Sequence, residues 1–96
     1  MKMVIIAFNE DIDEEVHDML KVCVQAEYTK WTKVMGWGQH SAPHLMDRVW
    51  PHGNNVLMMC VENEKAARIM QGVRDLRKTL RQEGVKAFLL PVDDVT

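Results

Sequence analysis

Three of the four histidines in this 96-residue chain fall in one short segment, together with an aspartate. The side chains in question are those of His40, His44, Asp47 and His52. Imidazole and carboxylate groups are ligands that zinc, copper or nickel accepts. A helical turn would bring the first three of these side chains to one face, although Pro43 favours a different kind of turn. The segment is a candidate transition-metal site, and the alternative is a set of exposed histidines that bind no metal.

Aromatic and basic side chains accompany these histidines. Trp31, Trp37 and Trp50 lie in or beside the segment, and an indole ring can stack on a nucleotide base or on a protein partner. Arg48 offers a guanidinium group that could pair with a phosphate or a carboxylate. The alternatives are tryptophans that only hold the segment in shape, and an ion pair between Arg48 and Asp47. The sequence therefore indicates ligand binding without naming the ligand.

The sequence holds no recognisable catalytic set. It lacks the Gly-x-Ser-x-Gly, P-loop and helical metalloprotease motifs, and Ser41 has no carboxylate at a suitable spacing to orient a neighbouring histidine. Cys23 and Cys60 lie in apolar runs, which predicts buried, reduced thiols rather than nucleophiles. We expect a binding protein and not an enzyme.

Composition excludes several broad classes of protein. Hydrophobic residues make up 47% of the chain and charged residues 27%, which is an ordinary globular balance. A net charge of −2 and an isoelectric point near 6.0 argue against nucleic-acid binding. The longest apolar runs hold about six residues, well below the roughly 20 of a membrane helix, so no membrane insertion is expected. Because Asn9 and two acidic residues follow the first run at once, we expect no signal peptide and a cytoplasmic protein.

Hydrophobic patterning predicts six elements of secondary structure. Continuous apolar or β-branched runs predict strands at 3–8, 28–35, 56–61 and 85–92. Apolar residues at helical spacing predict helices over 12–24 and 66–80, the first of them after an acidic stretch. For the second helix we expect Asn63 as N-cap and Gly84 as the stop signal. Gly72 interrupts this helix at a cost of about 1 kcal/mol relative to alanine.

This order of elements most economically forms a ferredoxin-like βαββαβ sandwich, an α+β fold with a four-stranded antiparallel sheet and two helices on one face. We expect one domain over residues 1–96, with the first and third strands in the centre of the sheet and a long loop at 39–55. The runs 3–8 and 56–61 are apolar throughout instead of alternating, so both faces of the sheet should be buried. The face without helices is predicted to pack against other copies of the chain.

The end of the second predicted strand reads Lys33-Val34-Met35-Gly36-Trp37-Gly38. It resembles the Val-x-Gly-Phe-Gly sequence found there in the PII-like superfamily, relatives of the nitrogen-regulatory PII signalling proteins, and the element order matches over the whole chain. The resemblance implies a homotrimer with ligand clefts between subunits. It also implies that residues 39–55 form a T-loop-like loop, which signals to a protein partner. Together with the aromatic and basic side chains described above, the predicted ligand-binding residues are Gly36, Trp37, Gly38, Gln39, Arg48 and Trp50.

The chain departs from the PII pattern at the positions that hold phosphate. The glycine- and lysine-rich loop of ATP-binding members is absent, because Arg81-Gln82-Glu83-Gly84 leads directly into the last strand. Asp93 and Asp94 stand where those members carry basic residues, and Gln39 stands where they usually carry arginine. PII regulation by tyrosine modification needs a tyrosine in the loop, and the only tyrosine, Tyr28, lies outside it. These departures predict weak ATP binding and argue against ordinary ATP and 2-oxoglutarate sensing.

Two main functions stay open from the sequence. The first is a trimeric regulator that binds a small ligand or metal ion near Trp37 and Gln39 and signals through the loop, with a membrane transporter among the candidate partners. The second is a metal-homeostasis protein, comparable to the cation-tolerance trimers of the same architecture, in which the loop histidines are the ligands. A third reading is a module whose loop only docks a partner.

Overall fold

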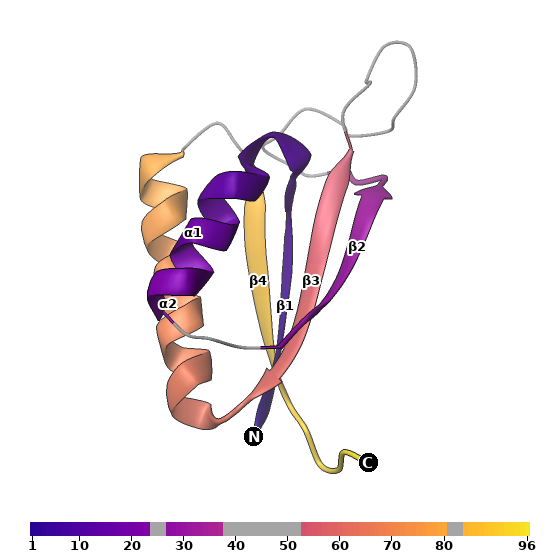
Figure 1. Ribbon diagram of the computed structural model, residues 1–96, viewed down its shortest axis with the longest axis vertical. Helices are drawn as coiled ribbons and strands as arrows, with labels where there is room; N and C mark the ends of the chain where they lie inside the picture. The colour runs from indigo at the N-terminus through magenta and orange to yellow at the C-terminus, as the bar shows by residue number, and fades with distance from the viewer. Residues whose placement is uncertain (24–26, 38–52, 81–83) are drawn as a thin grey trace.

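The computed structural model describes residues 1–23, 27–37, 53–80 and 84–96. The elements are, in chain order, β1 (Lys2–Asn9), the 3-10 turn η1 (Glu10–Ile12), α1 (Asp13–Cys23), β2 (Thr29–Val34), β3 (Asn54–Val61), α2 (Asn63–Thr79) and β4 (Val85–Pro91). Strands and helices therefore follow the predicted order. The α+β ferredoxin-like fold expected from the sequence is confirmed (Figure 1).

The four strands form one antiparallel sheet in the order β2-β3-β1-β4. The apolar strands β1 and β3 lie in its centre, as predicted, and Pro91 ends the edge strand β4, where a missing amide proton is tolerated. Figure 1 shows both helices on the same side of the sheet. The sheet consequently has one face covered by helices and one face that the helices leave open.

The core lies between the helices and the covered face of the sheet. Side chains alternate between the two faces along each strand, and Ile6, paired with Leu57 and Ala87, marks a row on the covered face. The fully buried side chains include Val4, Ile6, Phe8, Val16, Leu57 and Ile69. Each such side chain stabilises the fold by about 1.5–3 kcal/mol relative to an exposed one. This packing fixes α1 and α2 against the sheet.

The connection from β1 to α1 anchors the end of the sheet where β3 and β4 begin. The side chain of Asn9 accepts a hydrogen bond from the amide of Asp11 at 2.9 Å and so caps η1. The amide of Asn9 donates to the carbonyl of Gly84 at 2.9 Å, and that of Glu10 donates to the carbonyl of Gly53 at 3.0 Å. The acidic residues of this turn lie at the positive end of a helix, as expected.

Several boundaries differ from the sequence prediction. Asn63 is the first residue of α2 and not its N-cap; Glu62 occupies the cap position without a side-chain hydrogen bond. The helix reaches its C-cap at Leu80, whose amide donates to the carbonyl of Leu76 at 2.7 Å, so Gly84 does not stop it. Asn54 and Asn55, expected in the loop, belong to β3 because they pair with the end of β1.

The two cysteines are free thiols, as predicted, but both are half-buried rather than buried. Cys23 packs where α1 crosses α2, and Cys60 lies on the open face of β3. Within the four described ranges, no helix is both long and apolar enough to cross a membrane.

Candidate functional site

The open face of the sheet is apolar. Ile5 pairs with Met58 on one side and Phe88 on the other, and all three side chains point away from the helices. We use the name open sheet face for Met3, Ile5, Ala7, Val56, Met58, Cys60, Phe88 and Leu90. Phe88 is 50% exposed and Leu90 is 41% exposed. Large exposed apolar patches are typical of interaction sites.

The residues that follow β2 form the described part of the predicted ligand site. Trp37 is 75% exposed, and Met35 beside it is also exposed. Gly36 is half-buried, and a Cβ atom at this position would overlap the side-chain amide of Asn54. The glycine therefore lets the chain that leaves β2 pass close to the first residue of β3.

The structure places two of the predicted ligand-binding residues, Gly36 and Trp37, at the ends of β2 and β3. The remaining predicted site residues lie outside the described part of the chain: Gly38, Gln39, Arg48 and Trp50 for the ligand, and His40, His44, Asp47 and His52 for the metal. Their roles stay predictions. Among the described residues, no group of three or more histidine, cysteine, aspartate and glutamate side chains could hold a metal ion.

Edge strand β2 has an irregular end. Its pairing with β3 runs from Thr29 with Met58 to Trp31 with Val56, and the register then shifts before Val34 pairs with Asn54. Lys33 lies within this irregularity and has a φ of 58°. This value is in the left-handed region, which residues other than glycine rarely adopt. The strand is therefore bent immediately before the predicted ligand residues.

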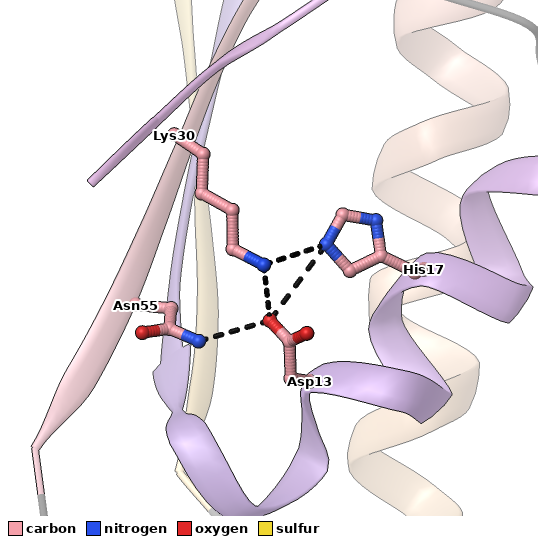
Figure 2. Close-up of polar contacts among 4 residues, drawn as sticks. All are labelled: Asp13, His17, Lys30 and Asn55. Atoms are coloured by element: carbon pink, nitrogen blue, oxygen red, sulfur yellow. Dashed lines mark hydrogen bonds and ion pairs between the residues drawn. The ribbon is translucent and has the colours of Figure 1, made fainter. Parts of the chain in front are cut away.

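A polar cluster that was not predicted from the sequence joins α1 to β2 and β3 (Figure 2). Lys30 Nζ of β2 lies 2.7 Å from Asp13 Oδ1 and 3.0 Å from His17 Nε2, both on α1. The side-chain amide of Asn55, on β3, donates to the same Asp13 oxygen at 2.9 Å. His17 Nε2 lies 3.7 Å from that oxygen. Asp13 therefore connects the beginning of α1 with both strands that flank residues 38–52.

The surroundings of Asp13 favour its charged form. Partial burial by itself would raise the pKa of this carboxyl group. The hydrogen bonds from Lys30 and Asn55 and the charge of Lys30 outweigh burial, so the pKa of Asp13 lies below its usual value. The carboxylate stays ionised at neutral pH and acts as an acceptor only.

The spacing of Asp13 and His17 was the only sequence signal for this cluster. Residues four apart share a helix face, so an acid and a histidine at this spacing are candidates for contact. Nothing local indicated Lys30, which lies 13 residues from His17, or Asn55, which lies 42 residues from Asp13. The ammonium group of Lys30 contacts both the Asp13 carboxylate and the His17 imidazole, so the cluster includes a positively charged side chain.

Comparison with known proteins shows the family of the chain. The family model for nitrogen regulatory protein P-II matches residues 1–96. No curated protein matched the sequence. Among solved structures, CPII from Thiomonas intermedia K12 bound to ADP and bicarbonate is 20% identical, with a TM-score of 0.67 over 97% of this chain and 88% of CPII.

A second similar structure comes from Thermus thermophilus and is described as a PII-like signaling protein. It is 23% identical and has a TM-score of 0.62 over 92% of this chain and 82% of its own. These identities show a shared fold, and the family match extends from the first residue to the last. The chain therefore belongs to the nitrogen regulatory protein P-II family.

Proposed function

We propose that this chain is the subunit of a homotrimeric cytoplasmic regulator, which binds a small ligand between subunits and signals to a protein partner through residues 39–55. The observation that carries the proposal is the open sheet face, on a chain that belongs to a regulatory family. A single domain over residues 1–96 is part of the same proposal.

The composition of the open sheet face supports assembly. Its central row, Met58, Ile5 and Phe88, is apolar and meets Thr29 of β2 at one end, and the next row ends in the apolar Leu90. Removing such a surface from water stabilises an assembly in proportion to the apolar area that is buried. Lys86, opposite Ala7, is exposed and marks a polar limit of the face at the edge of the sheet.

The ligand that we propose is an adenine nucleotide with few phosphates, alone or together with a small anion. CPII, which shares the fold, has been solved with ADP, AMP and bicarbonate. In this chain Asp93 and Asp94 follow β4 as exposed carboxylates, which would repel each added phosphate. We therefore expect AMP and ADP to bind more tightly than ATP.

Assembly is tested with two substitutions at adjacent residues. Phe88 is 50% exposed on the open sheet face, whereas Leu89 is 45% exposed and points to the helix side of the same strand. Phe88→Asp should convert the trimer to a monomer, because the charge would be buried between subunits. Leu89→Asp, with similar exposure in the single chain, should leave the trimer intact. Gel filtration with light scattering reads out both variants, and a monomeric parent would contradict the proposal.

Ligand binding is tested by calorimetry with AMP, ADP, ATP and bicarbonate, each alone and in pairs. The expected order of affinity is AMP or ADP above ATP. An ATP affinity in the micromolar range and above that of ADP would show that other residues hold the phosphates. Absence of binding by all four compounds would remove the nucleotide from the proposal and leave the assembly unaffected.

A further inference from the structure

We propose that His17 and Lys30 form a pH-sensitive latch, which holds the edge strand β2 against α1 while His17 is neutral and releases it when His17 takes up a proton. The latch lies wholly within the described residues, and its opening and closing do not depend on the identity of the ligand.

The geometry fixes the state in which the latch is closed. An ammonium group has donors only, so the 3.0 Å contact between Lys30 Nζ and His17 Nε2 requires a lone pair on Nε2. The imidazole must then be neutral and carry its proton on Nδ1. In this state Lys30 has two acceptors, Nε2 and the Asp13 oxygen at 2.7 Å.

Protonation of His17 removes one of these acceptors and adds a competitor for the other. Nε2 becomes a donor, and two cationic groups then lie 3.0 Å apart. Nε2 is 3.7 Å from Asp13 Oδ1, which already accepts hydrogen bonds from Lys30 and Asn55. The protonated ring is then a second charged donor that competes with Lys30 for this carboxylate. Lys30 is the donor that is also repelled by the ring.

The other groups around His17 do not offset this repulsion. Tyr28, just before β2, has its ring centroid 5.5 Å from that of the imidazole and offers no carboxylate that could pair with a protonated ring. On α1, Glu14 precedes His17 by three residues and Lys21 follows it by four; both are exposed and their charges oppose each other. Asn55 on β3 carries no charge.

Strand β2 depends on this latch because little else holds it to the helices. Within β2 only Lys30 and Val34 are half-buried, and the other side chains are exposed. Among the described residues, Lys30 makes the only side-chain hydrogen bonds that link β2 to α1. The backbone of β2 pairs with a neighbouring strand, β3, on one side only, and this pairing is interrupted between Trp31 and Val34. Release of Lys30 therefore leaves an edge strand held by a short ladder.

Amide hydrogen exchange on the full-length protein measures the latch directly. Protection at residues 29–34, corrected for intrinsic exchange, is compared with that of central strand β1 at about pH 8 and about pH 5. In the parent, protection of β2 relative to β1 should fall by about twofold to tenfold at the lower pH, the loss expected for one hydrogen bond. In His17→Gln the ratio should not change, since glutamine keeps an acceptor and does not titrate.

A second variant and a spectroscopic measurement keep the test decisive. Lys30→Gln removes the cation, so its β2 protection should be low at both pH values. Nitrogen NMR of the parent at about pH 8 should show the proton of the His17 ring on Nδ1. The proposal is overturned if the proton is on Nε2, if β2 protection in the parent does not fall relative to β1, or if His17→Gln shows the same fall.

Discussion

A Cβ atom on Gly72 would lie 2.7 Å from the sulfur of Met19, so α2 has no side chain at the point where α1 crosses it. The same atom would lie 3.0 Å from the sulfur of Cys23. Gly72 is buried, and an added methyl group would force the side chain of Met19 or Cys23 to shift. Glycine lowers helix stability relative to alanine, but at this position the absence of a side chain avoids an overlap with Met19 and Cys23.

Gly72→Ala tests this relationship. Alanine gains about 1 kcal/mol in helix propensity, but overpacking a buried contact costs about 1–3 kcal/mol, so we expect a net loss of about 1 kcal/mol. Chemical denaturation of the parent and the variant gives the free energy of unfolding. In a Met19→Ala background the loss should shrink or change sign. A gain of stability from Gly72→Ala in the parent background would contradict the packing argument.

Lys33 provides a backbone prediction, because its φ of 58° is strained for a residue with a Cβ atom. Lys33→Val should lower the free energy of unfolding by more than about 1 kcal/mol, since a β-branched side chain is an outlier in this region. Thr32→Val, at the exposed neighbour, is the control and should change stability by less than about 0.5 kcal/mol. Equal effects of the two substitutions, measured by urea denaturation, would argue against the left-handed conformation.

Asp13 makes stability depend on acid pH. The lowered pKa in the folded protein means that the charged carboxylate contributes stability at pH values above the ordinary aspartate pKa of 3.8. This contribution is lost as pH falls through the lowered pKa of the folded state. Asp13→Asn should therefore be less stable than the parent at neutral pH, with the difference shrinking in strong acid. Because the side chain is 36% exposed, we expect a modest difference.

Denaturation curves at neutral and at acid pH test this sign. Glu14→Gln removes a neighbouring exposed carboxylate of α1 and serves as the control. If the Asp13→Asn difference grows toward low pH, the carboxylate is not stabilised in its charged form.

The loop histidines give a prediction about metal. His40 and His44, with Asp47, should bind zinc, copper or nickel if the metal-homeostasis function holds, and binding should fail once the imidazoles are protonated. Replacing both histidines by alanine should abolish metal uptake and leave the oligomer intact. A thermal-shift series with each metal, followed by calorimetry, measures this. Equal uptake by parent and double variant, or no uptake by the parent, would remove these residues as ligands.

The fold could be predicted from the sequence because its signals are local. Runs such as Val4–Phe8 and Leu57–Val61, and the helical spacing of Ala66, Ile69 and Val73, report burial directly. Boundaries were less accurate where tertiary contacts decide them. Asn54 extends β3 by pairing with Asn9, and no property of the loop sequence indicates this partner.

The polar cluster was beyond sequence reasoning for a similar reason. Lys30 and Asn55 look like ordinary surface residues of two strands until the sheet places them beside Asp13. Lys33 gave no sign of its left-handed backbone, because lysine is not a residue typical of that region. Gly36, by contrast, is indicated by its motif, and the structure adds that a Cβ atom there would overlap the side chain of Asn54.

The pairing of Lys2 with Pro91 brings the beginning of β1 beside the end of β4, at the far end of the sheet from the exit of β2 and the start of β3 (Figure 1). A short peptide could join the two chain ends, and new ends could then be opened between residues 37 and 53. Such a circular permutant would keep every strand of the sheet while turning the segment at 38–52 into two independent tails. Comparing it with the parent would separate what the scaffold contributes to ligand binding from what an unbroken connection between β2 and β3 contributes.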